Sequence, residues 1–174
     1  NGIFGWFDFD GIYREANDRF NNALFCEVGS FQGRSACYLA ELIKESGKSN
    51  NLVCVDLWPT REELVTKADL GAGQSVEKDH IRSLPKSILE VFCDHMDAAG
   101  VRDYVYPVRQ DSSKAAAIFP DSYFSMIFID AGHEYDMVMK DLVAWFPKLK
   151  SGGIFAGHDY HDPGVSKAVR DYFG

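Results

Sequence analysis

Short apolar runs alternate along the chain with amphipathic stretches of helical period. The apolar runs have the length of buried strands and are bounded by polar or glycine residues; they cover 24–28, 52–55, 104–108, 125–129 and 154–156. Apolar residues that recur every three or four positions predict helices over 11–22, 35–44, 85–99, 113–119, 135–146 and 165–173. Strands that alternate with helices form right-handed βαβ units. The pattern therefore predicts an α/β fold with a doubly wound, mostly parallel sheet and helices on both faces.

Two segments depart from this alternation. Residues 59–84 are polar, contain Gly71-Ala72-Gly73, and are too long for an ordinary connection, which indicates an inserted lid or a mobile loop. The segment Trp6-Phe7-Asp8-Phe9 is aromatic and precedes the first predicted helix. Both segments are candidates for a lid over a binding site, and core packing is the alternative interpretation of the aromatic residues.

Length and composition are those of one globular domain over residues 1–174. Apolar residues make up 46% of the 174 residues and charged residues 25%, which excludes a disordered chain. No apolar run reaches the ~18–20 residues that cross a bilayer, so we expect no membrane partner. The chain begins at Asn1 without a methionine and stops at Gly174 directly after a helical pattern, so we expect it to be truncated at the C-terminus.

The charge and the cysteines exclude several classes of function. The net charge of −8 leaves no basic surface for phosphate contacts, so a nucleic-acid partner is disfavoured and a small-molecule partner is expected. The four cysteines form no C-x-x-C pair, which argues against zinc-ribbon and thioredoxin-type sites. We expect free thiols packed as small apolar side chains in a reducing, cytoplasmic environment. A homo-oligomer is compatible with these features.

The residues that follow the first two strands are candidates for binding a nucleoside. In an open α/β sheet, ligands bind at the carboxyl ends of the strands. Gly29 and Gly33 follow the first strand with G-x-x-x-G spacing, which differs from the dinucleotide and P-loop patterns and is also compatible with a plain turn. Asp56 ends the second strand, where an acid can accept hydrogen bonds from a ribose diol. A solvated acid or a helix cap is the alternative for Asp56. Asp111, after the third strand, could accept from an exocyclic amine or cap the next helix.

Histidines and carboxylates gather after the fourth and fifth strands. Asp130 and His133 follow one strand and His158 and Asp159 follow the other, which places them at neighbouring strand ends. Surface loops rarely collect such a set by chance, although a lone histidine is usually structural. We expect Asp130, His133, His158 and Asp159 to form a functional group.

The motifs taken together resemble those of class I S-adenosylmethionine-dependent methyltransferases. The chain is similar to the branch typed as methyltransferase domain 24, which also holds macrolide-sugar O-methyltransferases and cephalosporin-hydroxylase-like proteins. The resemblance covers roughly residues 5–173 and rests on motifs at five strand ends: Glu27-Val28-Gly29-x-x-x-Gly33-Arg34-Ser35, Val55-Asp56-Leu57-Trp58, Gln110-Asp111-Ser112, Asp130-Ala131-Gly132-His133-Glu134-Tyr135 and Gly157-His158-Asp159-Tyr160. It implies a Rossmann-like sheet of seven strands. Since five are predicted here, the terminal antiparallel pair is expected to be missing and strand five to be an exposed edge.

The resemblance also implies a binding site for S-adenosylmethionine. Glu27, Gly29 and Gly33 would hold the methionine part and Asp56 the ribose hydroxyls. Trp58 would lie beside the adenine, which Asp111 and Ser112 would bound. The full set of residues expected to bind the cofactor is Glu27, Gly29, Ser30, Gly33, Ser35, Asp56, Leu57, Trp58, Asp111, Ser112 and Asp130.

The expected reaction is methyl transfer to a hydroxyl group of a small molecule. His133, with Asp130 as the second catalytic residue, suits a general base because the ordinary pKa of histidine is near ~6.5. Related metal-dependent O-methyltransferases imply Mg²⁺ or another divalent cation on Asp130, His158 and Asp159. His158 stands where those enzymes usually carry an oxygen ligand, which Mg²⁺ prefers, so the sequence leaves the metal open.

Three other functions stay open at this point. The first is an oxidoreductase with a Rossmann-type fold, which the glycine spacing opposes. The second is a metal-dependent hydrolase that uses the histidine and aspartate group without a nucleoside. The third is a catalytically silent domain that binds the cofactor. The identity of the acceptor is not encoded in these motifs, because acceptor pockets are built from variable loops.

Overall fold

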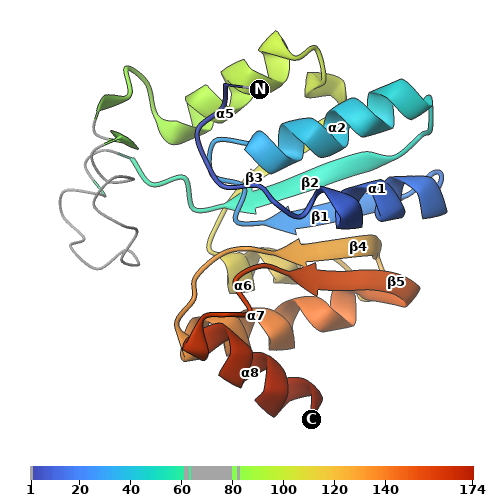
Figure 1. The fold of residues 1–174 in the computed structure, drawn as a ribbon, viewed down its shortest axis with the longest axis vertical. Coiled ribbons are helices and arrows are strands. Elements are labelled where there is room, and N and C mark those ends of the chain that lie inside the picture. Colours follow the sequence, from blue (N-terminus) through green and yellow to red (C-terminus); the bar gives the residue numbers. More distant parts are fainter. Residues whose placement is uncertain (1, 61–62, 64–79, 82) are drawn as a thin grey trace.

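The computed structural model describes residues 2–60, 63, 80–81 and 83–174 and contains a five-stranded parallel sheet (Figure 1). The strands are β1 (Leu24–Val28), β2 (Asn51–Asp56), β3 (Val105–Arg109), β4 (Phe124–Ile129) and β5 (Leu149–Gly157). The α-helices are α1 (Asp10–Arg19), α2 (Arg34–Ser46), α5 (Ile88–Ala98), α6 (Ser112–Ala115), α7 (Tyr135–Trp145) and α8 (Pro163–Phe173). Three short 3₁₀ turns, η1 (Arg102–Tyr104), η2 (Ala116–Ile118) and η3 (Phe146–Lys148), adjoin them.

The order of the strands creates a crossing point at the middle of the sheet. The strands lie in the order β3-β2-β1-β4-β5. β2 and β3 therefore lie on one side of β1, and the next strands of the chain, β4 and β5, lie on its other side. β1 pairs in parallel with both β2 and β4. The carboxyl ends of β1 and β4 therefore meet at the reversal of strand order, where ligands bind in open α/β sheets.

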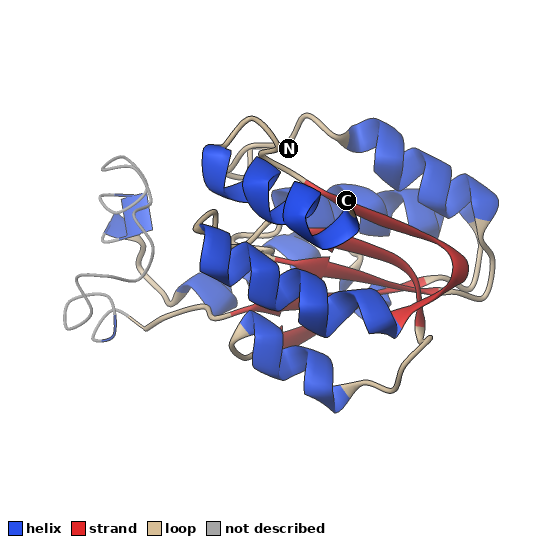
Figure 2. Cartoon of the chain, turned by 90° about the horizontal axis from the view of Figure 1, so that it is seen from below, coloured by secondary structure: helices blue, strands red, loops and turns tan. Residues whose placement is uncertain are grey.

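Helices cover both faces of the sheet (Figure 2). Alternate residues of each strand point to opposite faces, so Phe25 packs into the core under α1, α2 and α5, while Cys26 packs into the core under α6 and α7. α7 and α8 form a further apolar cluster beside β5. The predicted doubly wound α/β fold is confirmed. No helix in the described part of the chain is long and apolar enough to cross a membrane.

The largest difference from the predicted elements is the length of β5. The apolar run predicts 154–156, but the strand extends over Leu149–Gly157 and includes both glycines that precede the run. The pairing of β4 with β5 shifts register near Phe124 and Met126, and a Cβ at Gly153 would lie 2.9 Å from the carbonyl oxygen of Ser125. Glycine is needed there because the backbones approach closely, and a sequence pattern of turn residues cannot reveal this.

Local hydrogen bonding moves two predicted helix boundaries. The helix predicted over 85–99 begins at Ile88, because Ser87 and Glu90 form a capping box and Pro85 lies before the cap. The helix predicted over 113–119 is α6 followed by the η2 turn. Most of the insert predicted over 59–84 lies outside the described residues.

Candidate functional site

The β1 end approaches the β4 end so closely that only glycine fits between them. Gly29 has a φ of +94°, and its N–H donates to the carbonyl oxygen of Val55 at 2.8 Å. A Cβ at Gly29 would lie 1.9 Å from the carbonyl oxygen of Asp130. The residue thus permits both the left-handed backbone and the contact with the β4 end. This crossing point is the centre of the candidate site.

Asp56 connects the loops that follow β1 and β2. Its Oδ2 accepts from the backbone N–H of Phe31 at 2.8 Å, and its Oδ1 accepts from the backbone N–H of Trp58 at 2.9 Å. Phe31 and Trp58 both have a positive φ, a backbone conformation that residues other than glycine rarely adopt. Burial raises the pKa of Asp56, and backbone hydrogen bonds oppose that rise. Each carboxylate oxygen can still accept a further hydrogen bond, because it carries two lone pairs.

Trp58 lies in the core, beneath the loop that Asp56 holds. Its side chain is 1% exposed, its ring centroid lies 4.9 Å from that of Phe92, and its Nε1 donates to the carbonyl oxygen of Phe31 at 2.6 Å. The resemblance places this residue beside an adenine, whereas here it supports the loop from below. Leu57, its neighbour, is 44% exposed.

Several buried polar atoms on the β1 loop lack partners. Glu27 is 1% exposed, and its Oε2 accepts from the hydroxyl of Tyr13, while its Oε1 has no hydrogen-bond partner. Ser30 Oγ and Gln32 Nε2 are likewise buried without partners. Burial raises the pKa of Glu27 to about 7. Because buried polar groups are nearly always hydrogen-bonded, this set indicates a place where a polar ligand completes the hydrogen bonds. The sequence did not single out Tyr13 or Gln32.

Gly33 is the N-cap residue directly before α2, and it allows another helix to pack closely against this point. It has a φ of +85°, and a Cβ there would lie 2.7 Å from side-chain atoms of Met96 and Phe92 on α5. Its visible role is thus helix packing beneath the loop. Ser35 lies in the first turn of α2, and its hydroxyl is close enough to Glu27 to lower the pKa of that carboxyl.

Asp111 and Ser112 take part in the capping and packing of α6. Asp111 Oδ1 accepts from the backbone N–H of Lys114 at 3.2 Å, which is the helix-cap role that the sequence left open. The hydroxyl of Ser112 donates to Asp141 and accepts from Nε1 of Trp145. The Asp111 side chain is thus engaged in capping α6, and the Ser112 hydroxyl joins α6 to α7.

Asp130, His133 and Asp159 form a compact polar group at the ends of β4 and β5. One ligating atom of each residue lies within 4.8 Å of the others, an arrangement that could hold a metal ion. His133 Nε2 lies 2.9 Å from Asp159 Oδ2, and the side chain of His133 is 49% exposed. Burial raises the pKa of Asp130 to about 6. The predicted gathering of histidines and carboxylates at neighbouring strand ends is present.

His158 lies beside this group and also reaches the N-terminal segment. Its Nδ1 is 3.2 Å from Asp159 Oδ2 and 3.8 Å from Asp130 Oδ1, while its Nε2 is 2.8 Å from Asp8 Oδ1. The ring also lies 5.1 Å from that of Phe9. Partial burial lowers the pKa of His158, but the three acids outweigh it and the net shift is upward. The sequence left this aromatic segment as a candidate lid or as core packing; Phe9 and Phe7 pack in the core cluster while Trp6 is exposed, and nothing in the sequence indicated that Asp8 meets His158.

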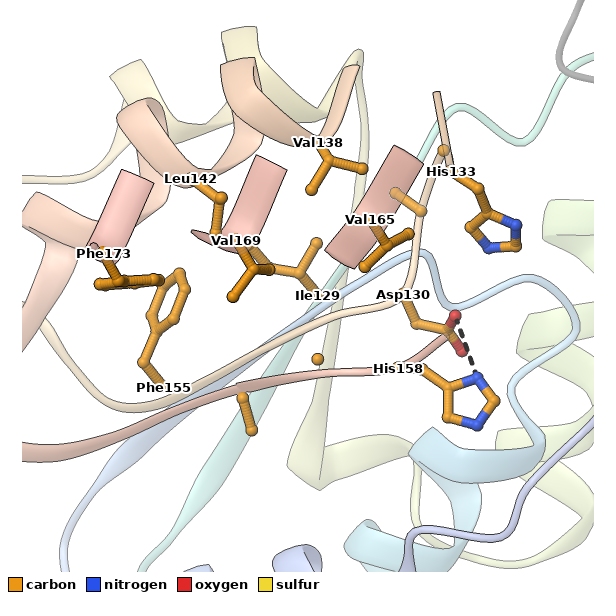
Figure 3. Close-up of a pocket in the computed structure, with 14 residues that line it drawn as sticks. Ile129, Asp130, His133, Val138, Leu142, Phe155, His158, Val165, Val169 and Phe173 are labelled. Atoms are coloured by element: carbon orange, nitrogen blue, oxygen red, sulfur yellow. Dashed lines mark ion pairs between the residues drawn. The ribbon is translucent and has the colours of Figure 1, made fainter. Parts of the chain in front are cut away.

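An apolar cavity of about 150 Å³ extends from the polar group between β4, β5, α7 and α8 (Figure 3). Figure 3 shows Asp130, His133 and His158 at one end of this cavity, followed by apolar side chains. The apolar lining includes Ile129, Val138, Leu142, Phe155, Val165, Val169 and Phe173. Chemically reactive groups thus border an apolar wall, as in many small-molecule sites.

Comparison with known families now assigns the class of protein. A family model described as "Methyltransferase domain" matches residues 26–160, which is most of the chain and includes every strand end described above. The chain therefore belongs to this methyltransferase family. Its parallel sheet and crossing point are those of the S-adenosylmethionine-dependent methyltransferase fold.

Solved structures of methyltransferases share this fold at low sequence identity. The O-methyltransferase NovP matches with a TM-score of 0.68 and 16% identity, over 93% of this chain and 69% of NovP. An S-adenosylmethionine-dependent O-methyltransferase from Thermotoga maritima matches with a TM-score of 0.64 and 14% identity, over 98% of this chain and 50% of that protein. The calicheamicin methyltransferase CalS11 matches with a TM-score of 0.60 and 20% identity, over 95% of this chain and 68% of CalS11. The chain thus spans between half and about two thirds of the length of these proteins. A search of curated proteins finds no match.

Proposed function

We propose that this chain catalyses transfer of the methyl group of S-adenosylmethionine to a hydroxyl group of a small molecule. The observation that carries the proposal is the His133–Asp159 pair, which stands beside Asp130 next to the glycine crossing at Gly29. The apolar cavity beside the pair favours an acceptor with an apolar part. Two of the structural neighbours are named O-methyltransferases, which agrees with a hydroxyl acceptor.

The residues of the β1 loop fit the proposed cofactor. The buried Oε1 of Glu27 and Oγ of Ser30 suit the charged methionine end, and Gly29 lets this loop lie directly against the backbone of Asp130. Asp56 retains lone pairs for the ribose hydroxyls. When bound, the cofactor supplies an electrophilic methyl group on a sulfonium. The protein then has to hold the acceptor in line and remove its proton.

His133 is suited to receive the proton of the acceptor hydroxyl. Its Nε2 lies 2.9 Å from Asp159 Oδ2, so a proton on Nε2 is donated to that carboxylate. The lone pair of Nδ1 then remains to accept the proton from the acceptor, since a neutral imidazole carries one donor and one acceptor nitrogen. Asp159 would hold this tautomer and stabilise the imidazolium that forms. Asp130 borders the same space, where it would orient the acceptor.

A divalent cation that holds the acceptor hydroxyl is a second part of the proposal. Asp130 and Asp159 supply carboxylate oxygens, and His158 completes the expected set with its Nδ1 close to both. A mixed oxygen and nitrogen set suits Mn²⁺ at least as well as Mg²⁺. The alternative set contains His133 in place of His158.

Removal of the cation provides the test of this second part. With a chelator in excess, activity should fall at least about tenfold, because a bound cation stabilises developing charge by several kcal/mol, and it should return with Mn²⁺ or Mg²⁺. Rates measured at graded free-cation concentrations check this. Full activity in chelator would reject the cation and leave the proposed methyl transfer in place.

Asp56→Ala is expected to weaken the binding of S-adenosylhomocysteine at least about tenfold. The substitution removes the acceptor for the ribose hydroxyls, each worth ~1.5–3 kcal/mol as a charged hydrogen bond. It also releases Phe31, so Trp58→Phe serves as a control that loosens the same loop by removing the indole bond and part of the buried ring, while leaving the Asp56 carboxylate in place. Calorimetric titration of both variants checks the expectation. A loss of similar size in both would assign Asp56 to the loop alone.

Titration of the unaltered protein separates the proposed function from its rivals. We expect S-adenosylhomocysteine to bind and NAD⁺ not to bind in separate calorimetric titrations, because the loop lacks the dinucleotide glycine spacing. Binding of NAD⁺ in place of S-adenosylhomocysteine would contradict the proposed function. Binding of S-adenosylhomocysteine without methylation of any hydroxyl acceptor would favour a silent cofactor-binding domain.

A further inference from the structure

Tyr13 of α1 joins the first helix to the β1 loop through one buried hydrogen bond. The residue is completely buried, and its hydroxyl donates to Oε2 of Glu27. Its ring is fixed by aromatic neighbours, with centroids 5.3 Å from Phe128 and 5.4 Å from Phe9. The orientation of the hydroxyl is therefore set by packing.

The carboxyl group that Tyr13 contacts has one oxygen free. Oε1 of Glu27 and Oγ of Ser30 are buried without a hydrogen bond of ordinary geometry, although the hydroxyls of Ser30 and Ser35 lie close enough to lower the pKa of Glu27. An acceptor in this condition carries a substantial desolvation cost unless a ligand donates to it. A group that donates hydrogen bonds and carries positive charge is the best complement to an ionised carboxylate.

We propose that Tyr13 is a positioning residue for the cofactor: by holding Oε2 of Glu27, it keeps Oε1 directed to accept from the ammonium group of the methionine part. This inference rests on the proposed function, since it takes S-adenosylmethionine as the ligand. Tyr13 lies on α1, before the region matched by the family model, and it would raise cofactor affinity by acting through Glu27.

The surroundings of Glu27 explain why the hydroxyl is needed. Besides Tyr13, the titratable groups that face Glu27 are Cys26 on β1, Cys54 on β2 and Asp130 after β4. None of these groups carries a positive charge. Burial raises the pKa of both thiols, so they stay neutral, and Asp130 raises the pKa of Glu27 further.

The hydrogen bond from Tyr13 is the chief interaction that opposes this rise. Burial raises the pKa of Glu27 to about 7, and hydrogen bonding from the hydroxyls of Tyr13, first of all, and of Ser30 and Ser35 lowers it from a still higher value. Burial and the neighbouring Glu27 also raise the pKa of Tyr13 itself, so that it remains a donor throughout the neutral range. Loss of the hydroxyl should therefore protonate Glu27 at neutral pH and remove the acceptor for an ammonium group.

The test compares two ligands that differ in the methionine part. S-adenosylhomocysteine carries the ammonium group, whereas 5′-methylthioadenosine lacks it and keeps the adenosine. In Tyr13→Phe, we expect calorimetric affinity for S-adenosylhomocysteine at pH 7 to fall about tenfold, the size of one charged hydrogen bond. Affinity for 5′-methylthioadenosine should stay within about twofold. Tyr38→Phe is the matched control, because it removes a hydroxyl from the same aromatic cluster that is not donated to Glu27.

The pH profile distinguishes this role from a merely structural one. In the unaltered protein, affinity for S-adenosylhomocysteine should rise between pH 6 and 8 as Glu27 ionises, consistent with its pKa of about 7. In Tyr13→Phe the rise should move to higher pH, so that raising the pH restores much of the lost affinity. If Tyr13→Phe does not fold, Glu27→Gln carries the test and should abolish the rise altogether.

Several outcomes would overturn the inference. Unchanged affinity for S-adenosylhomocysteine in Tyr13→Phe would do so, as would an equal loss for both ligands, which would mean that Tyr13 only supports the fold. A pH profile that does not move would also overturn it. If the unaltered protein binds neither ligand, the proposed function itself is contradicted, and this inference with it.

Discussion

His133→Ala should lower the rate of methyl transfer by about 10²–10⁴ and leave the affinity for S-adenosylhomocysteine within about twofold. That span is usual for the loss of a positioned general base. The imidazole lies at the ends of β4 and β5, held by Asp159 at 2.9 Å, and it makes no hydrogen bond to Oε1 of Glu27 or Oγ of Ser30. This variant is therefore expected to lose the rate of methyl transfer while it keeps its affinity for the cofactor product.

His161→Ala is the matched control for this experiment. Its Nε2 lies 3.7 Å from the other oxygen of Asp159, but its side chain is 84% exposed, so its loss should leave the rate nearly unchanged. Turnover is measured as release of S-adenosylhomocysteine with an acceptor found by screening hydroxylated small molecules. A fall of less than about threefold in a folded His133→Ala protein would make His133 structural and turn attention to His158. A changed cation requirement would instead identify His133 as a metal ligand.

Gly29→Ala should destabilise the protein by about 3–5 kcal/mol and abolish measurable binding of S-adenosylhomocysteine. A non-glycine residue at its φ of +94° costs ~1–3 kcal/mol. The added Cβ, 1.9 Å from the carbonyl oxygen of Asp130, must also push the β1 loop away from the β4 end. A cost of this size is a large part of the ~5–15 kcal/mol that stabilises an ordinary domain.

Gly47→Ala separates the two contributions. Gly47 also has a positive φ, +66°, but a Cβ there would meet nothing within 4 Å. Its substitution should cost only ~1–2 kcal/mol, the backbone penalty alone. Urea unfolding of both variants measures the difference. If both substitutions lowered the free energy of unfolding by the same amount, the close contact between Gly29 and Asp130 would contribute nothing to stability. The expected effect of this contact on cofactor binding would then lose its basis.

The sequence predicted the five strands and their parallel pairing well, because each strand is a short run of buried apolar residues bounded by polar or glycine residues. The full length of β5 could not be predicted, since the reason for Gly153 is a close approach to Ser125 on another strand. The sequence indicated Asp130 and His133 as candidates because Asp130 directly follows an apolar run and His133 stands three residues further on. Such local signals carry no information on side chains brought together from distant parts of the chain.

The residues that escaped prediction share this dependence on tertiary contact. Tyr13 reads as an ordinary apolar position of a helix, and only the fold sets its hydroxyl against Glu27. The family resemblance implies that Trp58 lies beside the adenine, which stays a prediction; the structure shows that its ring is buried in the core and that its backbone has a positive φ. The positive φ of Trp58 cannot be predicted from the residue type. This backbone conformation is stabilised by two hydrogen bonds, from its backbone N–H to Asp56 and from its Nε1 to the carbonyl oxygen of Phe31.

The pairing of β1 with β4 also bears on how the protein is made. Phe25 of β1 pairs with Met126 of β4. During synthesis, one edge of β1 therefore stays unpaired until about 100 further residues have been added, which takes roughly 5–20 s at ordinary elongation rates. The contact between Asp8 and His158 spans 150 positions and forms later still. Until then the nascent chain exposes an apolar strand edge that can pair with other chains. Within residues 1–174, the strand ends that carry Asp130, His133, His158 and Asp159 are therefore synthesised after the half of the sheet that contains β1, β2 and β3.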